Sequence, residues 1–311
     1  MTVHEQSGGK SASIGAADLQ ARLMLVALCC IWGITWPMMK IALTEIPPLS
    51  MRTITAGVGA LTLTAICLIR RRSLRVPRGR AWAHLVAASF LNLIAFSLFS
   101  AFAQIAAATS RVAILTYAMP IWALVLAWVI LRERPTRVQG VAITLCAIGL
   151  VVLISPLATT GVPIGLLLAV GSGFSWAAGT VYLKWARVEA DPVGFASWQV
   201  TIAFFVIGAA MLLFDGRLQI DHAHGHAIFA VLFTGVAGNA IAYALWFDIV
   251  ERVSALTATL GIVGIPVIGV VSTMLILGER LTLSDTVGFA FIFAASVCAQ
   301  LPAALSRRSR S

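Results

Sequence analysis

The sequence predicts an all-α integral membrane protein with ten transmembrane helices, arranged as two inverted five-helix repeats. Three observations predict this fold: the composition, a series of long apolar segments, and a stretch of sequence that occurs twice. Of the 311 residues, 60% are hydrophobic and only 11% are charged, whereas a soluble domain has about 25% charged residues. A water-facing surface cannot be built from this composition, so we expect the chain to lie in a bilayer.

Apolar segments that are long enough to cross a membrane follow one another along the chain. Runs of about 18 or more apolar residues are typical of membrane-spanning helices. Backbone polar groups must be paired inside lipid, and these segments are too long for barrel strands, so each is expected to be a helix. The expected spans are 22–43, 49–69, 82–104, 109–131, 138–154, 164–186, 193–214, 227–248, 254–277 and 284–305.

The two ends of the chain differ in composition from these spans. Residues 1–21 are polar and rich in Gly, Ser and Ala, which predicts a disordered cytoplasmic tail. Residues 306–311 are expected to form a short basic tail on the same side.

The distribution of charge predicts the orientation of the chain. With the N-terminus in the cytoplasm, ten spans put 17 Lys and Arg inside and 5 outside, which together make the 22 present. This bias follows the positive-inside rule, so the net charge of +10 requires no nucleic-acid partner. We expect a multi-pass protein of the inner (plasma) membrane with both termini in the cytoplasm and the lipid bilayer as its partner.

One stretch of sequence occurs twice. "PIWALVLAWVILRER" (Pro120–Arg134) recurs 146 positions later as "PVIGVVSTMLILGER" (Pro266–Arg280). An upstream match has an offset of 144, and its residues are Trp32, Lys40 and Pro48 against Trp176, Lys184 and Pro192. Agreement of the two offsets predicts a duplication, with repeats at 22–154 and 164–305. Because five crossings is an odd number, the second repeat enters from the opposite face, as in many secondary transporters.

The repeated stretch also predicts local roles. A proline inside a helix removes a backbone hydrogen bond and permits a kink, so Pro37, Pro120 and Pro266 are expected hinges. The dipeptides at the span ends are expected to form helix-end ion pairs, with a gating latch between the repeats as the other reading. These residues are Glu133 and Arg134 in the first repeat, and Glu279 and Arg280 in the second.

Two long stretches carry a resemblance to a known family. "CCIWGITWPMMKIAL" followed by "EIPPLSMRTITAGVGAL", and "ATSRVAILTYAMPIWALVLAWVILRERPTRVQGVAITLCAIGLVVL", resemble the EamA family of the drug/metabolite transporter superfamily. Within it, the chain is most similar to YddG-type exporters of aromatic and other neutral amino acids. The matching residues are Trp32, Gly33, Lys40, Pro47, Pro48, Arg52, Pro120 and Gly140.

The resemblance covers nearly the whole chain. It implies ten helices, cytoplasmic termini, and efflux of a metabolite through a central cavity. The second repeat departs from the pattern, with Ala196 where Arg52 would align and Ala177 where Gly33 would. A strictly symmetric role for Arg52 is therefore not expected.

The polar residues within the spans predict a substrate site without fixed charge. No Asp or Glu lies in the middle of a span, although a membrane carboxylate is typical of proton relays and cation sites. The candidate substrate-binding residues are Trp36, Asn92, Tyr117, Trp176, Asn239 and Tyr243. For the two amides, a helix–helix hydrogen bond is favoured over contact with substrate. For the aromatic residues, plain packing or lipid contact is an equal alternative.

These observations favour a secondary carrier that exports small neutral metabolites, above all amino acids, by alternating access and as a monomer. The alternative is a proton-coupled exporter of other metabolites or drugs. A membrane-embedded enzyme is disfavoured because no catalytic residues lie at depth, and a channel because charged pore rings are missing. We expect no cofactor, and "DHAHGH" (Asp221–His226) is expected to be a solvated loop rather than a metal site.

Overall fold

The computed structural model describes residues 6–157, 163–252 and 263–306, and every regular element in these ranges is helical. The first repeat comprises α1 (Gln6–Leu43), α2 (Pro48–Ile69), α3 (Arg80–Ser89), η1 (Phe90–Ala95), α4 (Phe96–Ala106), α5 (Thr109–Thr116), α6 (Met119–Leu131) and α7 (Arg137–Ile154). The second, after η2 (Ser155–Leu157), comprises α8 (Ile164–Ala186), α9 (Pro192–Phe214), α10 (Gly225–Phe233), η3 (Thr234–Ile241), α11 (Ala242–Arg252), α13 (Gly264–Leu277) and α14 (Leu283–Ser306).

The helices confirm the predicted membrane fold. Within the described ranges, nine helical segments are long and apolar enough to cross a bilayer. Two of them, Thr109–Leu131 and Ile164–Ala186, have the predicted ends. The shorter α13 is the described part of the predicted span 254–277, whose first residues lie outside the described ranges.

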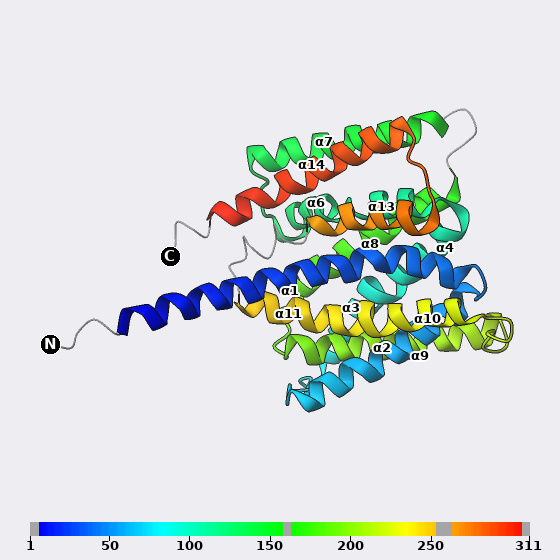
Figure 1. The fold of residues 1–311 in the computed structure, drawn as a ribbon, viewed down its shortest axis with the longest axis horizontal. Helices are drawn as coiled ribbons and strands as arrows, with labels where there is room; N and C mark the ends of the chain where they lie inside the picture. The colour runs from blue at the N-terminus through cyan, green and yellow to red at the C-terminus, as the bar shows by residue number, and fades with distance from the viewer. Residues whose placement is uncertain (1–5, 158–162, 253–262, 307–311) are drawn as a thin grey trace.

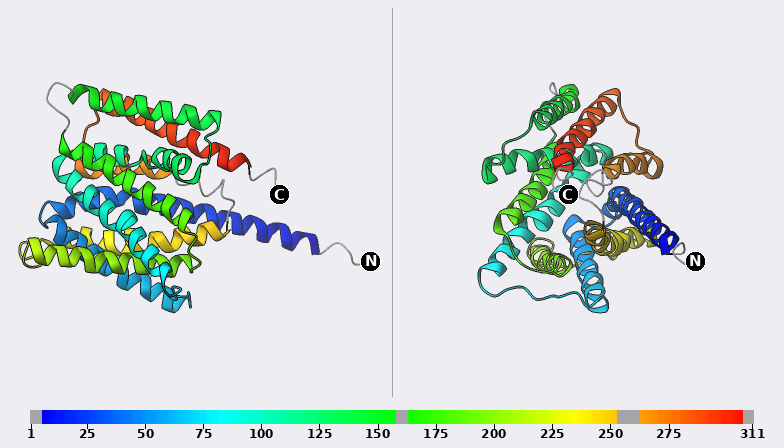
Figure 2. Two further views of the ribbon diagram at one scale, coloured as in Figure 1. Left: turned by 180° about the vertical axis from the view of Figure 1, so that it is seen from behind. Right: turned by 90° about the vertical axis from the view of Figure 1, so that its left-hand side faces the viewer.

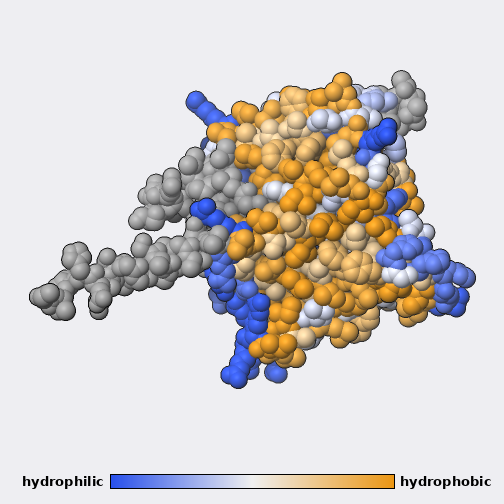
Figure 3. Space-filling model, in the orientation of Figure 1, coloured by the Kyte–Doolittle hydropathy of each residue, from blue (hydrophilic) through white to orange (hydrophobic). Residues whose placement is uncertain are grey.

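The long helices lie along a common axis, and the bundle has a hydrophilic surface at each end of this axis. Figure 3 shows a continuous apolar band between these ends, as a bilayer requires. The start of α1 and the end of α14 lie at one side of the bundle, which we call the terminal end, and the other side is the opposite end (Figure 1). The fifth span, α7, finishes at the opposite end, so the second repeat crosses the bundle in the inverted sense.

The two repeats pack into each other rather than forming separate domains. Two contacts join equivalent helices, α2 with α9 and α7 with α14. Helix α1 packs against α13, and their equivalents in the other repeat, α8 and α6, pack against each other. In the end-on view of Figure 2, α7 and α14 lie at one side of the bundle and α2 and α9 at the other.

The contact between α7 and α14 is close because glycines face each other. A Cβ on Gly149 would lie 3.0 Å from the carbonyl oxygen of Gly288, and a Cβ on Gly288 would lie 3.2 Å from that of Gly149. Small residues let helix backbones approach in this way in membranes.

The predicted disordered tail is wrong from Gln6 onward. Helix α1 begins at Gln6 and continues through residues 6–21 into the first span. Extending an existing helix avoids the cost of nucleation, and the segment contains several alanines and no proline. At the other end, α14 continues to Ser306, while residues 1–5 and the predicted basic tail from 307 lie outside the described ranges.

Candidate substrate site

A cavity of about 650 Å³ lies between the two repeats. Residues of both repeats line it, and they lie on α1, α2, η1, α4, α6, α8, α9, η3, α11 and α13 and at Tyr117 after α5. All six residues predicted from the sequence line this one cavity: Trp36, Asn92, Tyr117, Trp176, Asn239 and Tyr243. The geometry brings them together, and their binding of substrate stays a prediction.

The aromatic residues form one pair in each repeat. In the first repeat, Trp36 Nε1 donates to the Tyr117 hydroxyl at 2.9 Å, with ring centroids 5.9 Å apart. In the second repeat, Trp176 stacks on Tyr243 with centroids 6.3 Å apart and an interplanar angle of 28°. Trp32 meets Tyr243 edge-on at 6.0 Å. These contacts hold flat apolar walls in fixed positions.

The third and eighth spans each contain a π-helical segment, which the hydropathy pattern does not predict. Asn92 lies in η1 and Asn239 in η3, 147 positions apart. Side chains from the first helix of the other repeat donate to these segments: Ser175 Oγ to the Leu91 carbonyl at 2.7 Å, and Trp32 Nε1 to the Gly238 carbonyl at 3.2 Å. π-Helical segments are rare and frequent at functional sites, and here they border the cavity in both repeats.

The two asparagines differ in their hydrogen bonds. Asn239 Nδ2 donates to the Thr55 carbonyl of α2 at 3.2 Å, which agrees with the helix–helix reading. Asn92 Oδ1 is buried without a partner among the described residues. It lies against Gly179, where a Cβ would clash with this oxygen.

The cavity communicates with the terminal end. It extends to Leu183, Val188 and Pro192 around the connection from α8 to α9, and Pro192 is exposed. At its other limit, Met39 and Ser100 are buried, with 3% and 0% of their surface exposed. Among the described residues, the cavity is therefore open toward the terminal end and closed at the opposite end.

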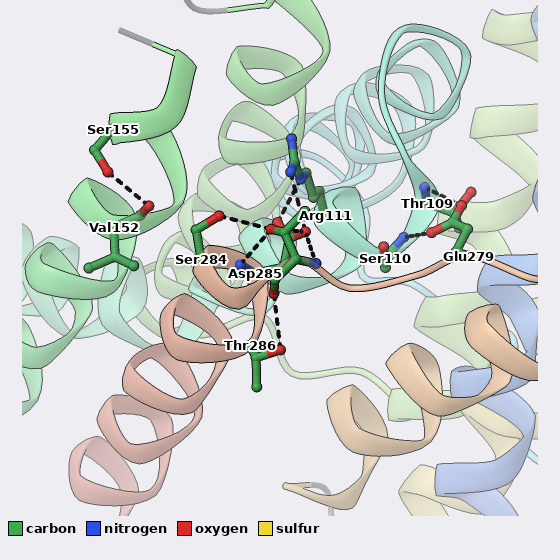
Figure 4. Close-up of polar contacts among 10 residues, drawn as sticks. Thr109, Ser110, Arg111, Val152, Ser155, Glu279, Ser284, Asp285 and Thr286 are labelled. Carbon is green, nitrogen blue, oxygen red and sulfur yellow. Dashed lines mark hydrogen bonds and ion pairs between the residues drawn. The ribbon is translucent and has the colours of Figure 1, made fainter.

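Two contacts between the repeats hold the opposite end closed (Figure 4). The Glu279 carboxylate accepts the backbone N–H groups of Thr109 and Ser110, both at 2.8 Å. These donors begin α5, where a helix has unpaired N–H groups and a positive dipole end. Arg111 donates to both carboxylate oxygens of Asp285, at 2.6 and 3.2 Å, and the Asp285 side chain is only 4% exposed.

A third contact at this end involves the predicted "DHAHGH" loop. The backbone N–H of His224 donates to Glu45 at 2.6 Å, and ring nitrogens of His224 and His226 approach the same carboxylate at 3.1 and 3.0 Å. The backbone hydrogen bond from His224 lowers the pKa of the Glu45 carboxyl, and the nearby imidazoles add to this effect. Both imidazoles are largely exposed, and no group of metal-binding residues occurs in the described ranges.

The expected helix-end ion pairs are only partly present. Glu133 pairs with Lys184 of the second repeat at 2.7 Å, and both side chains are at least half exposed. For Glu279 the expectation is wrong, because its carboxylate binds the start of α5 instead. Arg134 and Arg280 are exposed and form no ion pair within the described ranges.

The prolines begin helices more often than they kink them. Pro37 lies inside α1 as expected. The fourth span is interrupted after Thr116, so Pro120 falls in the first turn of α6, and Pro266 falls in the first turn of α13. The expectation of a kink inside a continuous helix is thus wrong for Pro120. Pro120 has no backbone N–H, so it cannot donate a helical hydrogen bond to the Thr116 carbonyl. This carbonyl faces Gly173 of α8, where a Cβ would lie 2.7 Å from the oxygen.

One charged residue of the cavity was missed. Arg52 lines the cavity and is only 6% exposed, although the predicted topology makes it one of the five basic residues on the outer side. The predicted absence of fixed charge from the site is therefore wrong. A long basic side chain near a span end can extend to water or turn inward, and hydropathy does not indicate which. Gln199, also a cavity residue at 6% exposure, was missed as well.

Known proteins resemble the chain over nearly its whole length. The sequence profile of the EamA-like transporter family matches residues 20–155 and 163–299. The uncharacterised transporter YvbV of Bacillus subtilis is 29% identical over 282 residues, covering 89% of this chain and 90% of YvbV. A protein of Salmonella typhimurium named a probable amino-acid metabolite efflux pump is 25% identical, covering 85% of this chain and 89% of its own.

The fold also matches solved structures. One crystal structure superposes with a TM-score of 0.65 over 94% of this chain and 99% of its own. Its sequence is 21% identical, so it shows the likeness of fold alone.

Proposed function

Because the chain belongs to the EamA-like transporter family, we propose that it is a secondary carrier exporting small neutral metabolites, above all amino acids. As a member of this family, the chain is a membrane transporter and not an enzyme, since relatives are named transporters or efflux pumps. The observation that carries the finer proposal is a cavity between the repeats, which aromatic and amide side chains line and which the described residues close at one end.

The cavity suits an amino acid in size and chemistry. Its volume of about 650 Å³ falls within the usual 300–1,000 Å³ range of ligand pockets. The Trp36–Tyr117 and Trp176–Tyr243 pairs offer faces for an apolar side chain. Among the described lining residues there is no carboxylate, which argues against proton-coupled export of cationic drugs.

The inverted repeats supply a mechanism of alternating access. If the two repeats exchange their slightly different packings, the cavity closes at the terminal end and opens at the opposite end. The segment Arg70–Arg80 contains six arginines and follows α2 at the terminal end, so the positive-inside rule supports a cytoplasmic terminal end. The described state is then inward-open in the plasma membrane, and one chain encloses the whole cavity, which supports function as a monomer.

Counterflow in proteoliposomes tests the proposal. The panel contains labelled neutral amino acids, sugars and cationic dyes, each with and without a pH gradient. We expect saturable, trans-stimulated exchange of neutral amino acids that needs no pH gradient. Dye exchange that depends on a pH gradient would replace the proposal with the proton-coupled alternative, and uptake without saturation would indicate a channel.

A pair of tryptophan variants localises the transport to the cavity. Trp176→Ala should reduce exchange because it removes one aromatic wall. Trp185→Ala is the matched control, since Trp185 is 54% exposed and lies outside the cavity lining on the same helix. Equal exchange by both variants would contradict the role of the cavity.

A further inference from the structure

Arg52 is the one charged side chain among the described residues that line the cavity. Its Nη2 donates to Ser100 Oγ at 2.7 Å and to the Met39 sulfur, and both acceptors are neutral. Its Nε is buried without a partner, and no described residue accepts from Nη1. A guanidinium has five N–H donors, so the one on Nε and the two on Nη1 remain unpaired.

This arrangement leaves a positive charge uncompensated in a membrane. A charged side chain inside a membrane protein is costly unless it is paired or reaches water, and buried charges are normally paired. The buried Asp285 carboxylate follows that rule, because it is paired with Arg111. Arg52 forms no ion pair within the described ranges, because a hydroxyl and a thioether orient a guanidinium without neutralising it. The cavity therefore lacks a counter-anion.

The position of Arg52 indicates where such an anion would bind. Arg52, Met39 and Ser100 lie at the closed limit of the cavity. A ligand that enters from the terminal end meets the aromatic pairs on its way and Arg52 at the far end. Its anionic group would then lie on the guanidinium while its apolar part stays between the rings.

The number of charges identifies the class of anion. One guanidinium neutralises one negative charge, and its planar fork matches a carboxylate. A phosphate monoester carries about −1.5 to −2 charges at neutral pH and would need a second cation, which the described lining does not contain. The cavity fits a monocarboxylate.

We propose that Arg52 binds the carboxylate of the transported substrate. The cavity then selects monocarboxylates, including amino acids with a free α-carboxylate, over the corresponding amides and over cations. This inference rests on the proposed function, because it assigns the polar end of the same cavity, and it extends the substrate class to acids without an amino group.

Binding of two isosteric probes to the purified full-length protein tests the inference. Benzoate and benzamide have the same ring and differ in the carboxylate, and tryptophan fluorescence and thermal unfolding report their binding. We expect benzoate to bind about tenfold more tightly than benzamide, as a charge-assisted bidentate contact would give. Arg52→Gln and Arg52→Met should remove this preference, and Arg52→Lys should keep part of it because it retains the charge without the fork.

Arg217→Gln is the matched control, since it also removes one positive charge, from a side chain that is 74% exposed. It should leave both affinities unchanged. Equal affinity of the unmodified protein for benzoate and benzamide, or binding of neither, would overturn the inference whether or not the Arg52 variants fold. An unchanged preference in Arg52→Gln or Arg52→Met would overturn it as well.

The counterflow assay separates this inference from the proposed function. Amino-acid exchange with an unchanged apparent KM in Arg52→Gln would refute the role of Arg52 and leave amino-acid export standing. Arg52-dependent benzoate binding without exchange of any amino acid would keep the carboxylate site and refute amino-acid export.

Discussion

Glu279 and Glu133 hold equivalent places in the two repeats, 146 positions apart, yet they make different contacts. Glu279 binds two backbone N–H groups at the start of α5 and joins the repeats at the closed end. Among the described side chains, Glu133 pairs with the exposed Lys184 alone, at the open end. The counterpart of Thr109 would be Ala255, which lies outside the described ranges. Identical dipeptides therefore make contacts that differ with the packing of their repeat, and this asymmetry distinguishes the closed end from the open one.

The largest effect is expected from Arg111→Gln at the closed end. It removes the cation from Asp285, whose side chain is 4% exposed. Removing one partner of a buried ion pair typically costs 3–5 kcal/mol. Because Thr282 still donates to Asp285, we expect a loss of about 3 kcal/mol in the free energy of unfolding.

Thermal and denaturant unfolding of the purified protein measure this loss. Arg217→Gln is the control, because its ion pair with Asp221 is exposed and should contribute less than about 1 kcal/mol. Equal losses in the two variants would show that the closed end is not held by the buried pair.

The next largest effect is expected from Gly173→Ala. The new Cβ would lie 2.7 Å from the backbone oxygen of Thr116, which cannot move without shifting α5. Overpacking of this kind costs about 1–3 kcal/mol, and it should slow exchange because α8 and the fourth span meet here. Gly140→Ala is the control, since nothing lies within 4 Å of a Cβ at Gly140. Loss of stability in Gly140→Ala but not in Gly173→Ala would contradict the close contact.

A smaller effect is expected from Glu279→Gln. The amide has one acceptor oxygen and no charge, so it caps α5 less well, at a cost of about 1 kcal/mol. This corresponds to a roughly fivefold rise in the population that is open at the opposite end. Spin labels at Thr44 and His222, which are exposed at that end, would report the change as a longer distance.

The smallest effect is expected from Glu133→Gln. An ion pair as exposed as Glu133–Lys184 contributes about 0–1 kcal/mol, and it does not hold the closed end. The distance between labels at Thr44 and His222 should not change. If Glu133→Gln lengthened that distance as much as Glu279→Gln, the two ends would not differ in the way the contacts indicate.

The sequence predicted the spans well because a bilayer demands about 20 apolar residues, whichever way a helix faces. It did not predict the rotation of α2 about its axis, and this rotation turns Arg52 into the cavity. The paired Asn92 and Asn239 were recognised, but their π-helical backbone depends on donors from the other repeat, Ser175 and Trp32. Such contacts arise only when the repeats pack together.

The most direct test of a cavity that is open at one end uses Gln199→Cys in a protein whose five native cysteines are replaced. Gln199 lines the cavity and is buried apart from 6% of its surface. In sealed membrane vesicles of known orientation, a membrane-impermeant maleimide should label this cysteine from the terminal-end side, and a transported amino acid should slow the labelling. Labelling from the opposite side alone would contradict a resting state in which the cavity between the repeats is open at the terminal end.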